Sequence, residues 1–250
     1  MKEELVTVIT ANYNANEFIV QTIESVLSQE YQNWEMIIID DLSTDDSIKT
    51  IKSYQKKDSR IKLIELKENG GPAIARNIGI KQANGRYIAF LDSDDVWTND
   101  KLRKQIGFMR DKDIPFSYAS YDLIDEENNN MGEFLVEGKV NYKGLLKTCD
   151  IGCLTAVYDT RQLGRIEMPI ILRRQDYGLW LKLLKKTDYA YAIEDKLGIY
   201  RLRKSSISSN KKRAAAYQWK IYRDIEQLNI FKSVYYFIHY AINGFKKYKK

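Results

Sequence analysis

Three carboxylates stand within four residues in the segment FLDSDD, where Asp92, Asp94 and Asp95 follow an apolar run. Carboxylates this close repel one another unless a counter-ion lies between them. Oxygen ligands with no histidine or cysteine nearby favour Mg²⁺ or Mn²⁺, which keep waters or substrate phosphates in the remaining positions. The alternative is an acidic start to the helix predicted over 98–110, where aspartates cap amides and favour the helix dipole. The triplet alone leaves both interpretations open.

A second acidic segment, DDLSTDD, follows another apolar run. Its first two residues, Asp40 and Asp41, can accept hydrogen bonds from a nucleobase or a ribose, and Tyr13 in ANYN offers a ring on which a base can lie. In the structural alternative, DLSTDD caps the next helix and Tyr13 is a packed loop aromatic. Taken singly, each segment favours that alternative.

A third segment places two glycines, Gly70 and Gly71, before Pro72, which suits the first turn of a helix. Glycines let the backbone approach an anion closely, and Arg76 with the helix amino terminus adds positive charge. A Gly-Gly-Pro turn is equally a plain helix start. By itself the segment is a weak indication of a phosphate site.

The elements that must position these segments alternate in type over the first hundred residues. Apolar and β-branched runs predict strands, and apolar residues at helical spacing predict helices between them. The strands are expected over 5–10, 34–40, 61–66 and 86–92, and the helices over 18–27, 45–54 and 72–83. Repeated strand-helix-strand units form a doubly wound sheet, in which ligands bind beyond the carboxyl ends of the strands. The polar segments should therefore converge on one edge of the sheet.

The pattern weakens after residue 110. There, FSYASYDLID predicts a strand, ENNNMG a hairpin turn and RRQDYGLWLKLLKK a helix, and the chain from residue 211 onward looks helical.

A chain of 250 residues, 44% of them hydrophobic, suits one large core. Its cysteines, Cys149 and Cys153, and its single histidine cannot form a thiolate or thiolate-histidine zinc site. The sequence predicts neither a signal peptide nor a spanning helix, so we expect a cytoplasmic protein.

Four segments occur in the order and at the intervals of a known family. VTVITANYN, IIIDDLSTDD, NGGPAIARNIGIKQANGRYIAFLDSDD and RRQDYGLWLKL together resemble the inverting family 2 glycosyltransferases of the glycosyltransferase A fold. The resemblance covers about 5–210 and implies an α/β fold, a Rossmann-like, mixed but mainly parallel sheet flanked by helices. It implies a catalytic domain over 1–210, with a nucleotide-sugar-binding half over 1–110 and an acceptor-binding half over 111–210. Residues 211–250 would form a basic, amphipathic helical tail.

The resemblance also implies metal-dependent transfer of a sugar from a UDP-sugar to a hydroxyl of a saccharide or lipid-linked acceptor, as in bacterial teichuronic acid, capsule or other surface polysaccharide synthesis. Asp176 would be the general base, and Asp94 would bind the Mn²⁺ or Mg²⁺ cofactor, with Asp95 near the metal and donor sugar. Trp180 would wall the acceptor site, and Arg203 would contact acceptor or diphosphate. The implied nucleotide contacts are Ala11, Tyr13 and Asp41 at the uracil, Asp40 beside them, Asn69 and Arg76 along the nucleotide, Asp92 at the ribose, and Ser93.

The sequence departs from the family pattern at several positions. Ala11 stands where the family usually has proline, and Leu42 replaces a glycine, which demands an ordinary backbone conformation. Gln175 replaces a glutamate beside the base, and Arg203, in YRLRKSSIS, replaces a histidine. An arginine can hold a diphosphate but cannot ligate a metal. These changes motivate an alternative function, that of a non-catalytic sugar-nucleotide-binding partner subunit.

The charge is unevenly distributed, with 13 basic and 2 acidic residues over 201–250 but 27 basic and 32 acidic residues over 1–200. A basic tail favours an anionic surface as partner. No zinc pattern, RNA-recognition signature or basic zipper supports nucleic acid, so we expect no nucleic-acid partner.

An apolar stripe at helical spacing runs over 230–245, between lysines, and is too short to span a bilayer of about 30 Å. It comprises Ile230, Phe231, Val234, Tyr235, Phe237, Ile238, Ala241, Ile242 and Phe245. We predict that it lies in the interface of an anionic membrane, on the inner face of the cell membrane. The alternative is a helix that packs its stripe on the catalytic domain or on a second subunit of a homo-oligomer.

Overall fold

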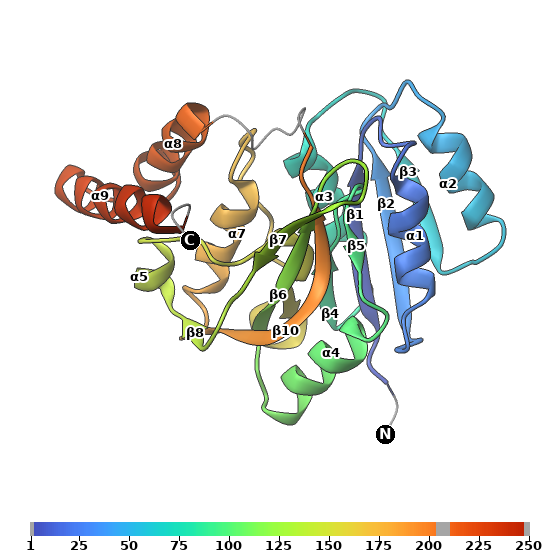
Figure 1. The fold of residues 1–250 in the computed structure, drawn as a ribbon, viewed down its shortest axis with the longest axis horizontal. Coiled ribbons are helices and arrows are strands. Elements are labelled where there is room, and N and C mark those ends of the chain that lie inside the picture. The colour runs from blue at the N-terminus through green and yellow to red at the C-terminus, as the bar shows by residue number, and fades with distance from the viewer. Residues whose placement is uncertain (1–2, 204–210, 248–250) are drawn as a thin grey trace.

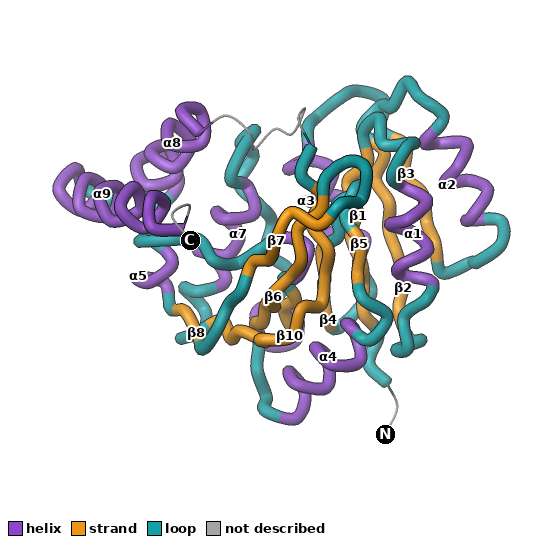
Figure 2. Tube along the Cα trace, in the orientation of Figure 1, coloured by secondary structure: helices purple, strands orange, loops and turns teal. Residues whose placement is uncertain are grey.

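A computed structural model describes residues 3–203 and 211–247, and one sheet of ten strands runs through this part of the chain (Figures 1 and 2). The strands are β1 (Val6–Asn12), β2 (Trp34–Asp40), β3 (Ile61–Glu65), β4 (Tyr87–Phe90), β5 (Val96–Trp97), β6 (Phe116–Ile124), β7 (Asn130–Phe134), β8 (Lys139–Val140), β9 (Val157–Asp159) and β10 (Ala190–Arg201). Their order across the sheet is β3-β2-β1-β4-β9-β6-β10-β5, with β7 beside β6 and β8 beside β10.

The first four strands confirm the predicted parallel sheet. β1 pairs in parallel with β2 on one side and with β4 on the other, and β2 pairs in parallel with β3. Every residue of β2 is buried, as expected for a parallel strand covered on both faces. In the register, Asn12 lies opposite Asp40, so the polar segments after β1 and β2 begin side by side.

Four helices cover the first half, as predicted, and lie on both faces of the sheet. They are α1 (Ile19–Leu27), α2 (Ser47–Gln55), α3 (Pro72–Gln82) and α4 (Lys101–Asp111). Apolar residues of α1, α2 and α4 pack with one set of sheet side chains, which includes Val8, and those of α3 with the other set, which includes Ile9. A Cβ on Gly79 of α3 would lie 2.5 Å from Cγ2 of Ile9, so glycine permits this close helix-sheet approach.

The second half mixes strand directions. β9 lies antiparallel between β4 and β6, and the predicted hairpin is present as the antiparallel pair β6 and β7. Short helices α5 (Tyr142–Leu145), η1 (Cys153–Thr155) and α6 (Thr160–Leu163) precede α7 (Gln175–Leu183), which confirms the predicted helix. The long strand β10 was not predicted; it runs parallel to β6 and antiparallel to β5, so it meets the acidic segment after β4.

The carboxyl-terminal helices are α8 (Lys211–Lys220), the π-helix η2 (Ile221–Ile225) and α9 (Ile230–Lys247). They stand beside α7 and α5 at the opposite end of the molecule from α2 (Figure 1). Ile221 and Tyr222 are fully buried in the hydrophobic cluster that also contains Trp180, so η2 shares the core on which α7 packs. The predicted boundary at residue 210 falls at 204–210, outside the described residues. Among the helices described, none is long and apolar enough to cross a membrane.

Candidate active site

The loops after β1 and β2 are tied together by the fully buried carboxylate of Asp40. It accepts hydrogen bonds from Nδ2 of Asn12 at 2.7 Å and from the backbone N–H and Oγ of Ser43 at 2.8 and 2.6 Å. The backbone N–H of Asn14 donates to the same Ser43 hydroxyl at 2.9 Å. Asp40 therefore lies beneath the predicted nucleotide site and fixes its loops, and it does not cap α2.

The neighbouring carboxylate of Asp41 reaches the third segment instead. Its Oδ1 accepts from the N–H of Gly70 at 2.7 Å and its Oδ2 from the N–H of Gly71 at 2.8 Å. Nδ2 of Asn69 donates to the backbone carbonyl of Asp41 at 3.0 Å. Gly71 has a φ of 82°, which glycine adopts without steric cost. The structure thus brings these predicted residues together. Asp41 does not cap α2, but the end of DLSTDD does, because Asp46 is the N-cap of α2 and Oδ1 of Asp45 accepts from the N–H of Ser47 at 3.0 Å.

Two exposed apolar residues border these loops. The Tyr13 side chain is 51% exposed, so it is not the packed aromatic of the structural alternative. Leu42 is exposed and has a φ of 67°, in the left-handed region, so the expected ordinary backbone conformation is wrong. The turn keeps the shape that glycine would favour, and leucine adopts it at a steric cost. Ala11 is half-buried and packs against the core.

The acidic triplet lies in the turn between β4 and β5. The N–H of Asp95 donates to the carbonyl of Asp92 at 3.1 Å, which closes the turn, and Ser93 within it is buried. The N-cap of α4 is Asp100, five residues further on. The interpretation of the triplet as an acidic helix start is therefore wrong.

Arginines lie beside two carboxylates of the triplet. Nη2 of the buried Arg76 donates to Oδ1 of Asp92, and Nη1 of Arg203 lies 3.1 Å from Oδ2 of Asp94. Burial raises the pKa of the Asp94 carboxyl, the charge of Asp92 adds to that rise, and Arg203 opposes it. The positive charges of Arg76 and Arg203 thus reduce the repulsion among the carboxylates of the triplet.

Arg201, the last residue of β10, donates hydrogen bonds to Asp94 and Asp95 of the triplet. The sequence did not predict this contact. The Arg201 side chain is 2% exposed, and its backbone N–H donates to Oδ1 of Asp95 at 2.9 Å. Its guanidinium donates to the carbonyls of Asp94 and Asp125 and to side-chain oxygens of Asn128 and Gln21, at 2.7 to 3.1 Å. The residue lies 106 positions from Asp95, so no local pattern could reveal this contact.

A metal site can be tested against these residues. Within residues 3–203 and 211–247, no three histidine, cysteine or acidic side chains are grouped to hold a metal ion. Mg²⁺ and similar ions, however, commonly bind one or two carboxylates together with substrate phosphates. The Asp94 side chain is 24% exposed, and Oδ2 of Asp95 is buried with no hydrogen-bond partner in the described part of the chain. These two carboxylates fit that type of site.

Asp176 lies in the first turn of α7 and is half-buried. Burial disfavours the charge of Arg76, but the charges of Asp92 and Asp176 and the nearby Cys153 contribute to raising its pKa. Burial likewise raises the pKa of the Cys153 thiol, which Arg76 opposes and both aspartates reinforce. The proposed base and the acidic triplet therefore act on the same groups. Cys153 thus lies near these groups, a position that the sequence did not predict.

Trp180 belongs to the core rather than to an acceptor site, so this prediction is wrong. Its side chain is 0% exposed, and its ring centroid lies 5.7 Å from that of Phe90 and 5.4 Å from that of Phe116. Trp180 is buried because α7 packs against the sheet, where the tryptophan ring lies beside Phe90 of β4 and Phe116 of β6. Gln175, which precedes the proposed base, is also buried.

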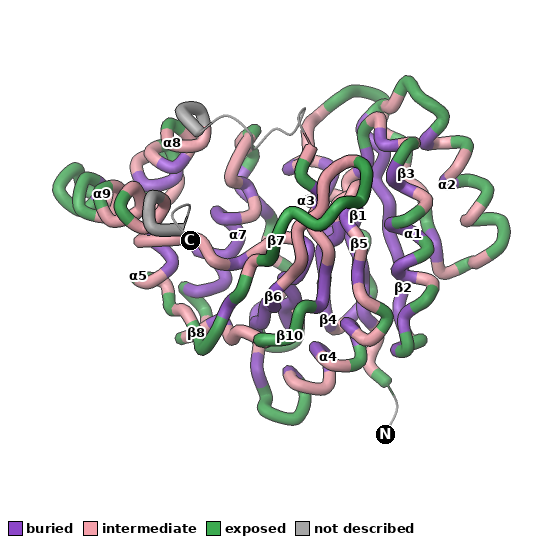
Figure 3. The backbone as a smooth tube through the Cα atoms, viewed as in Figure 1, coloured by how far each residue is buried: buried purple, intermediate pink, exposed green. Residues whose placement is uncertain are grey.

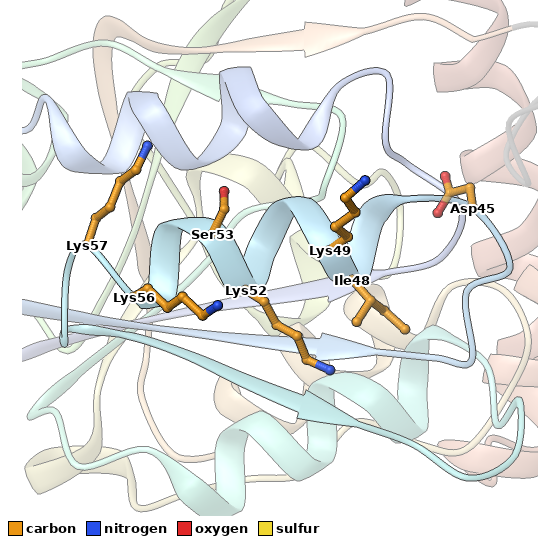
Figure 4. A pocket seen from close by; sticks show the side chains of 7 residues that line it. All are labelled: Asp45, Ile48, Lys49, Lys52, Ser53, Lys56 and Lys57. Carbon is orange, nitrogen blue, oxygen red and sulfur yellow. The ribbon is translucent and has the colours of Figure 1, made fainter.

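An open pocket of about 700 Å³ lies along α2, and no residue of the acidic triplet lines it (Figure 4). Its lysines are spread along the helix in Figure 4, and Lys52 pairs with Glu65 at 2.7 Å. The residues that line it are Asp45, Ile48, Lys49, Lys52, Ser53, Lys56 and Lys57. These groups do not converge on one point, so the pocket has no evident catalytic arrangement.

Solved structures share this fold. A Staphylococcus aureus TarS structure in complex with UDP-GlcNAc matches with a TM-score of 0.72 and 20% identity, over 88% of this chain and 66% of that one. A Pyrobaculum calidifontis mannosyltransferase in complex with GDP-Man and Mn²⁺ matches with a TM-score of 0.69 and 18% identity, over 89% of this chain and 64% of that one. The chain thus spans slightly less than two thirds of both solved chains, and they support the predicted fold class.

Relatives in sequence match over nearly the whole chain. The putative teichuronic acid biosynthesis glycosyltransferase TuaG of Bacillus subtilis is 46% identical over 97% of both chains. The Escherichia coli enzyme WfgD, named as a UDP-Glc:alpha-D-GlcNAc-diphosphoundecaprenol beta-1,3-glucosyltransferase, is 41% identical over 99% of this chain and 96% of its own. The model of glycosyl transferase family 2 matches residues 7–161, which include the triplet and the loops that surround it. The chain therefore belongs to glycosyl transferase family 2 and is a glycosyltransferase.

Proposed function

We propose that this protein transfers a sugar from a UDP-sugar to a hydroxyl of a lipid-linked saccharide, with inversion and with a divalent metal, in the synthesis of a bacterial surface polysaccharide. The names of TuaG and WfgD support the pathway and the acceptor class. The observation that carries the proposal is the position of Arg76, whose buried guanidinium donates to Asp92 of the triplet, while the charge of Asp176 of α7 contributes to raising the Arg76 pKa. A donor site at the triplet and a proton acceptor on α7 would thus be adjacent.

The donor nucleotide would lie across the loops after β1, β2 and β4. The exposed ring of Tyr13 is suited to stack on a base, and the buried Asp40 acts by holding the loops in place. The proposed nucleotide contacts are Ala11, Tyr13, Asp41, Asn69, Arg76, Asp92 and Ser93, whereas Asp40, which is fully buried, supports the loops that carry them.

Asp94 would bind Mn²⁺ or Mg²⁺ together with the diphosphate of the donor, with Asp95 beside it. When bound, the metal offsets the negative charge that develops on the departing UDP. Arg203 lies 3.1 Å from Asp94 and supplies a further positive charge for the diphosphate or the acceptor.

Asp176 would accept the proton of the attacking hydroxyl. The acceptor oxygen forms the new bond to the anomeric carbon while the bond to UDP breaks, and the electron pair leaves with UDP. A single inversion needs one carboxylate base, and Asp176 is the acidic residue in the first turn of α7. The amino-terminal end of α7 therefore belongs to the catalytic part of the site.

We infer that the protein acts in the cytoplasm, bound peripherally to the inner face of the cell membrane. A lipid-linked acceptor requires access to a bilayer, and the basic residues over 201–250 favour an anionic leaflet. Such binding would raise the effective concentration of the acceptor around the enzyme.

Titration with UDP in the presence and absence of Mn²⁺ tests the donor site. We expect Mn²⁺ to strengthen UDP binding to the wild type, and Asp94→Ala to remove that increment while the fold stays intact. The control, Asp111→Ala, alters an exposed carboxylate at the end of α4 and should keep the increment. Equal UDP affinity with and without Mn²⁺ in the wild type would contradict the metal site.

A second assay tests turnover. Release of UDP from UDP-sugars, measured with acceptor present, separates an enzyme from a non-catalytic binding subunit.

A further inference from the structure

Helix α9 carries apolar side chains on two faces. On the inner face, the ring centroid of Phe237 lies 5.6 Å from that of Trp219, and the centroid of Tyr236 lies 6.3 Å from that of Tyr222. The opposite face is exposed along the outer turns in Figure 3, and Phe231 there is 84% exposed. We call this row the outer face of α9; it consists of Ile230, Phe231, Val234, Tyr235, Ile238 and Ile242. The predicted stripe therefore divides, with Phe237 packed on the core.

The charge of the carboxyl-terminal sequence indicates what covers the outer face. Scattered exposed apolar residues are ordinary, but a contiguous row on one helix marks a binding surface. Five lysines and no acidic residue follow Glu226 in the sequence. Two copies joined through α9 would bring these lysines together, whereas anionic lipid headgroups would neutralise them. The observations therefore favour an anionic bilayer as the occupant.

The inner face of α9 contacts the residue that starts the catalytic helix. Nη2 of Arg174 donates to the hydroxyl of Tyr240, and the guanidinium lies 5.4 Å from the centre of the Tyr240 ring. Arg174 is the N-cap of α7, two residues before Asp176, and has a φ of 64°. Such a conformation is costly for arginine and persists only when its surroundings hold it. Tyr240 supplies part of that support.

We propose that α9 couples membrane docking to the catalytic helix: its outer face binds anionic lipid, and its inner face, through Tyr240 and Arg174, positions the start of α7. Docking restrains the already folded α9, and the restrained helix holds Arg174 more firmly and hence the first turn that carries Asp176. Tyr240 and Arg174 are thus positioning residues. The assignment of Asp176 as the base and the membrane as occupant rest on the proposed function, whereas the coupling of α9 to α7 through Tyr240 and Arg174 rests on their contact alone.

Two measurements on the full chain, without nucleotide, test the proposal. One is co-sedimentation with vesicles of equal parts phosphatidylglycerol and phosphatidylcholine, and the other is amide hydrogen exchange of α7 with and without those vesicles. In the wild type we expect binding to the mixed vesicles but not to phosphatidylcholine alone, and exchange of α7 slowed about tenfold on binding, the scale of one hydrogen bond to a charged group. The double variant Phe231→Glu with Ile238→Glu should lose both responses.

Matched variants separate docking from coupling. Tyr240→Phe removes one hydroxyl and should bind the vesicles normally without slowing exchange in α7, while Tyr235→Phe removes a hydroxyl from the outer face and should behave as wild type. Leu135→Glu places a charge on an exposed leucine outside α9 and should bind normally. If Tyr240→Phe does not fold, Arg174→Lys, which keeps the charge but loses the planar guanidinium, replaces it.

Three results would overturn the proposal: normal binding by the double variant, normal slowing in Tyr240→Phe, or an outer face occupied by a second copy in a dimer that ignores vesicles. Absence of UDP-sugar turnover with both vesicle responses intact would instead contradict the proposed function and leave the coupling standing.

Discussion

The two halves of the molecule build their parts of the site in different ways. In residues 3–110, the polar contacts of the site join loops that follow neighbouring parallel strands, such as Asp40 with Asn12 and Asp41 with Gly70. In the second half, the decisive residues lie far along the chain from the groups they serve, as Arg201 does from the triplet. The loops of the first half are thus fixed by local topology, whereas the proposed base and Arg201 depend on how the second half packs.

Removing Arg201 tests whether the second half supports the first. We expect Arg201→Met to lower the free energy of unfolding by about 3 kcal/mol, because it leaves the buried carbonyl of Asp94 and the side-chain oxygen of Gln21 without their donor. Chemical denaturation measures this change. The control Arg203→Met loses a half-exposed ion pair and should cost much less. Equal losses in the two variants would remove the distinction between the halves.

The buried Lys101 makes the contact between α4 and the sheet sensitive to pH. Burial lowers the pKa of Lys101 to about 7, while its ammonium lies 3.9 Å from the centre of the Trp97 ring, which favours the charged form. Between pH 7 and about 10.5 the unfolded chain binds a proton that the folded chain lacks, so stability falls as the pH falls through this window and levels off below pH 7.

We therefore expect Lys101→Met to raise the free energy of unfolding by about 1 to 3 kcal/mol at pH 7, and this gain to shrink as the pH approaches 10. Thermal denaturation across that range measures it. The control Lys104→Met, on the same helix, loses ion pairs to Asp100 and Asp195 and should not stabilise the protein. A gain in Lys101→Met that does not vary with pH would show that its charge is not the cause.

The smallest effect is expected at Leu42 in the donor half. Because its φ is 67° and its side chain is exposed, Leu42→Gly should raise the free energy of unfolding by about 0.5 kcal/mol, as strain relief slightly exceeds the entropy that glycine adds to the unfolded chain. Leu135→Gly, at an exposed leucine without a positive φ, should instead destabilise. Destabilisation of both variants would contradict the interpretation of Leu42 as strained.

The sequence predicted the donor half well because its signals are local. Apolar runs predicted β1 to β4, and the rule for the carboxyl ends of parallel strands predicted that the segments after β1 and β2 meet, as Asn12 and Asp40 do. The prediction for Trp180 failed because seven of the nine residues of α7 are buried, so the sequence does not distinguish a tryptophan packed in the core from one that lines a site. Arg201 was missed because its partners lie in three separate segments, and β10 because its bulges interrupt the strand pattern.

The most direct test of the division between donor binding and catalysis uses Asp176→Asn, which keeps the size and hydrogen bonding of the side chain but cannot accept the proton. UDP affinity is measured by calorimetry, and turnover is measured as UDP released from the UDP-sugar in the presence of acceptor. We predict unchanged UDP affinity and a turnover number at least about a hundredfold lower, the usual scale of general-base catalysis. Near-normal turnover, or a loss of UDP affinity that accounts for the lost activity, would contradict the account.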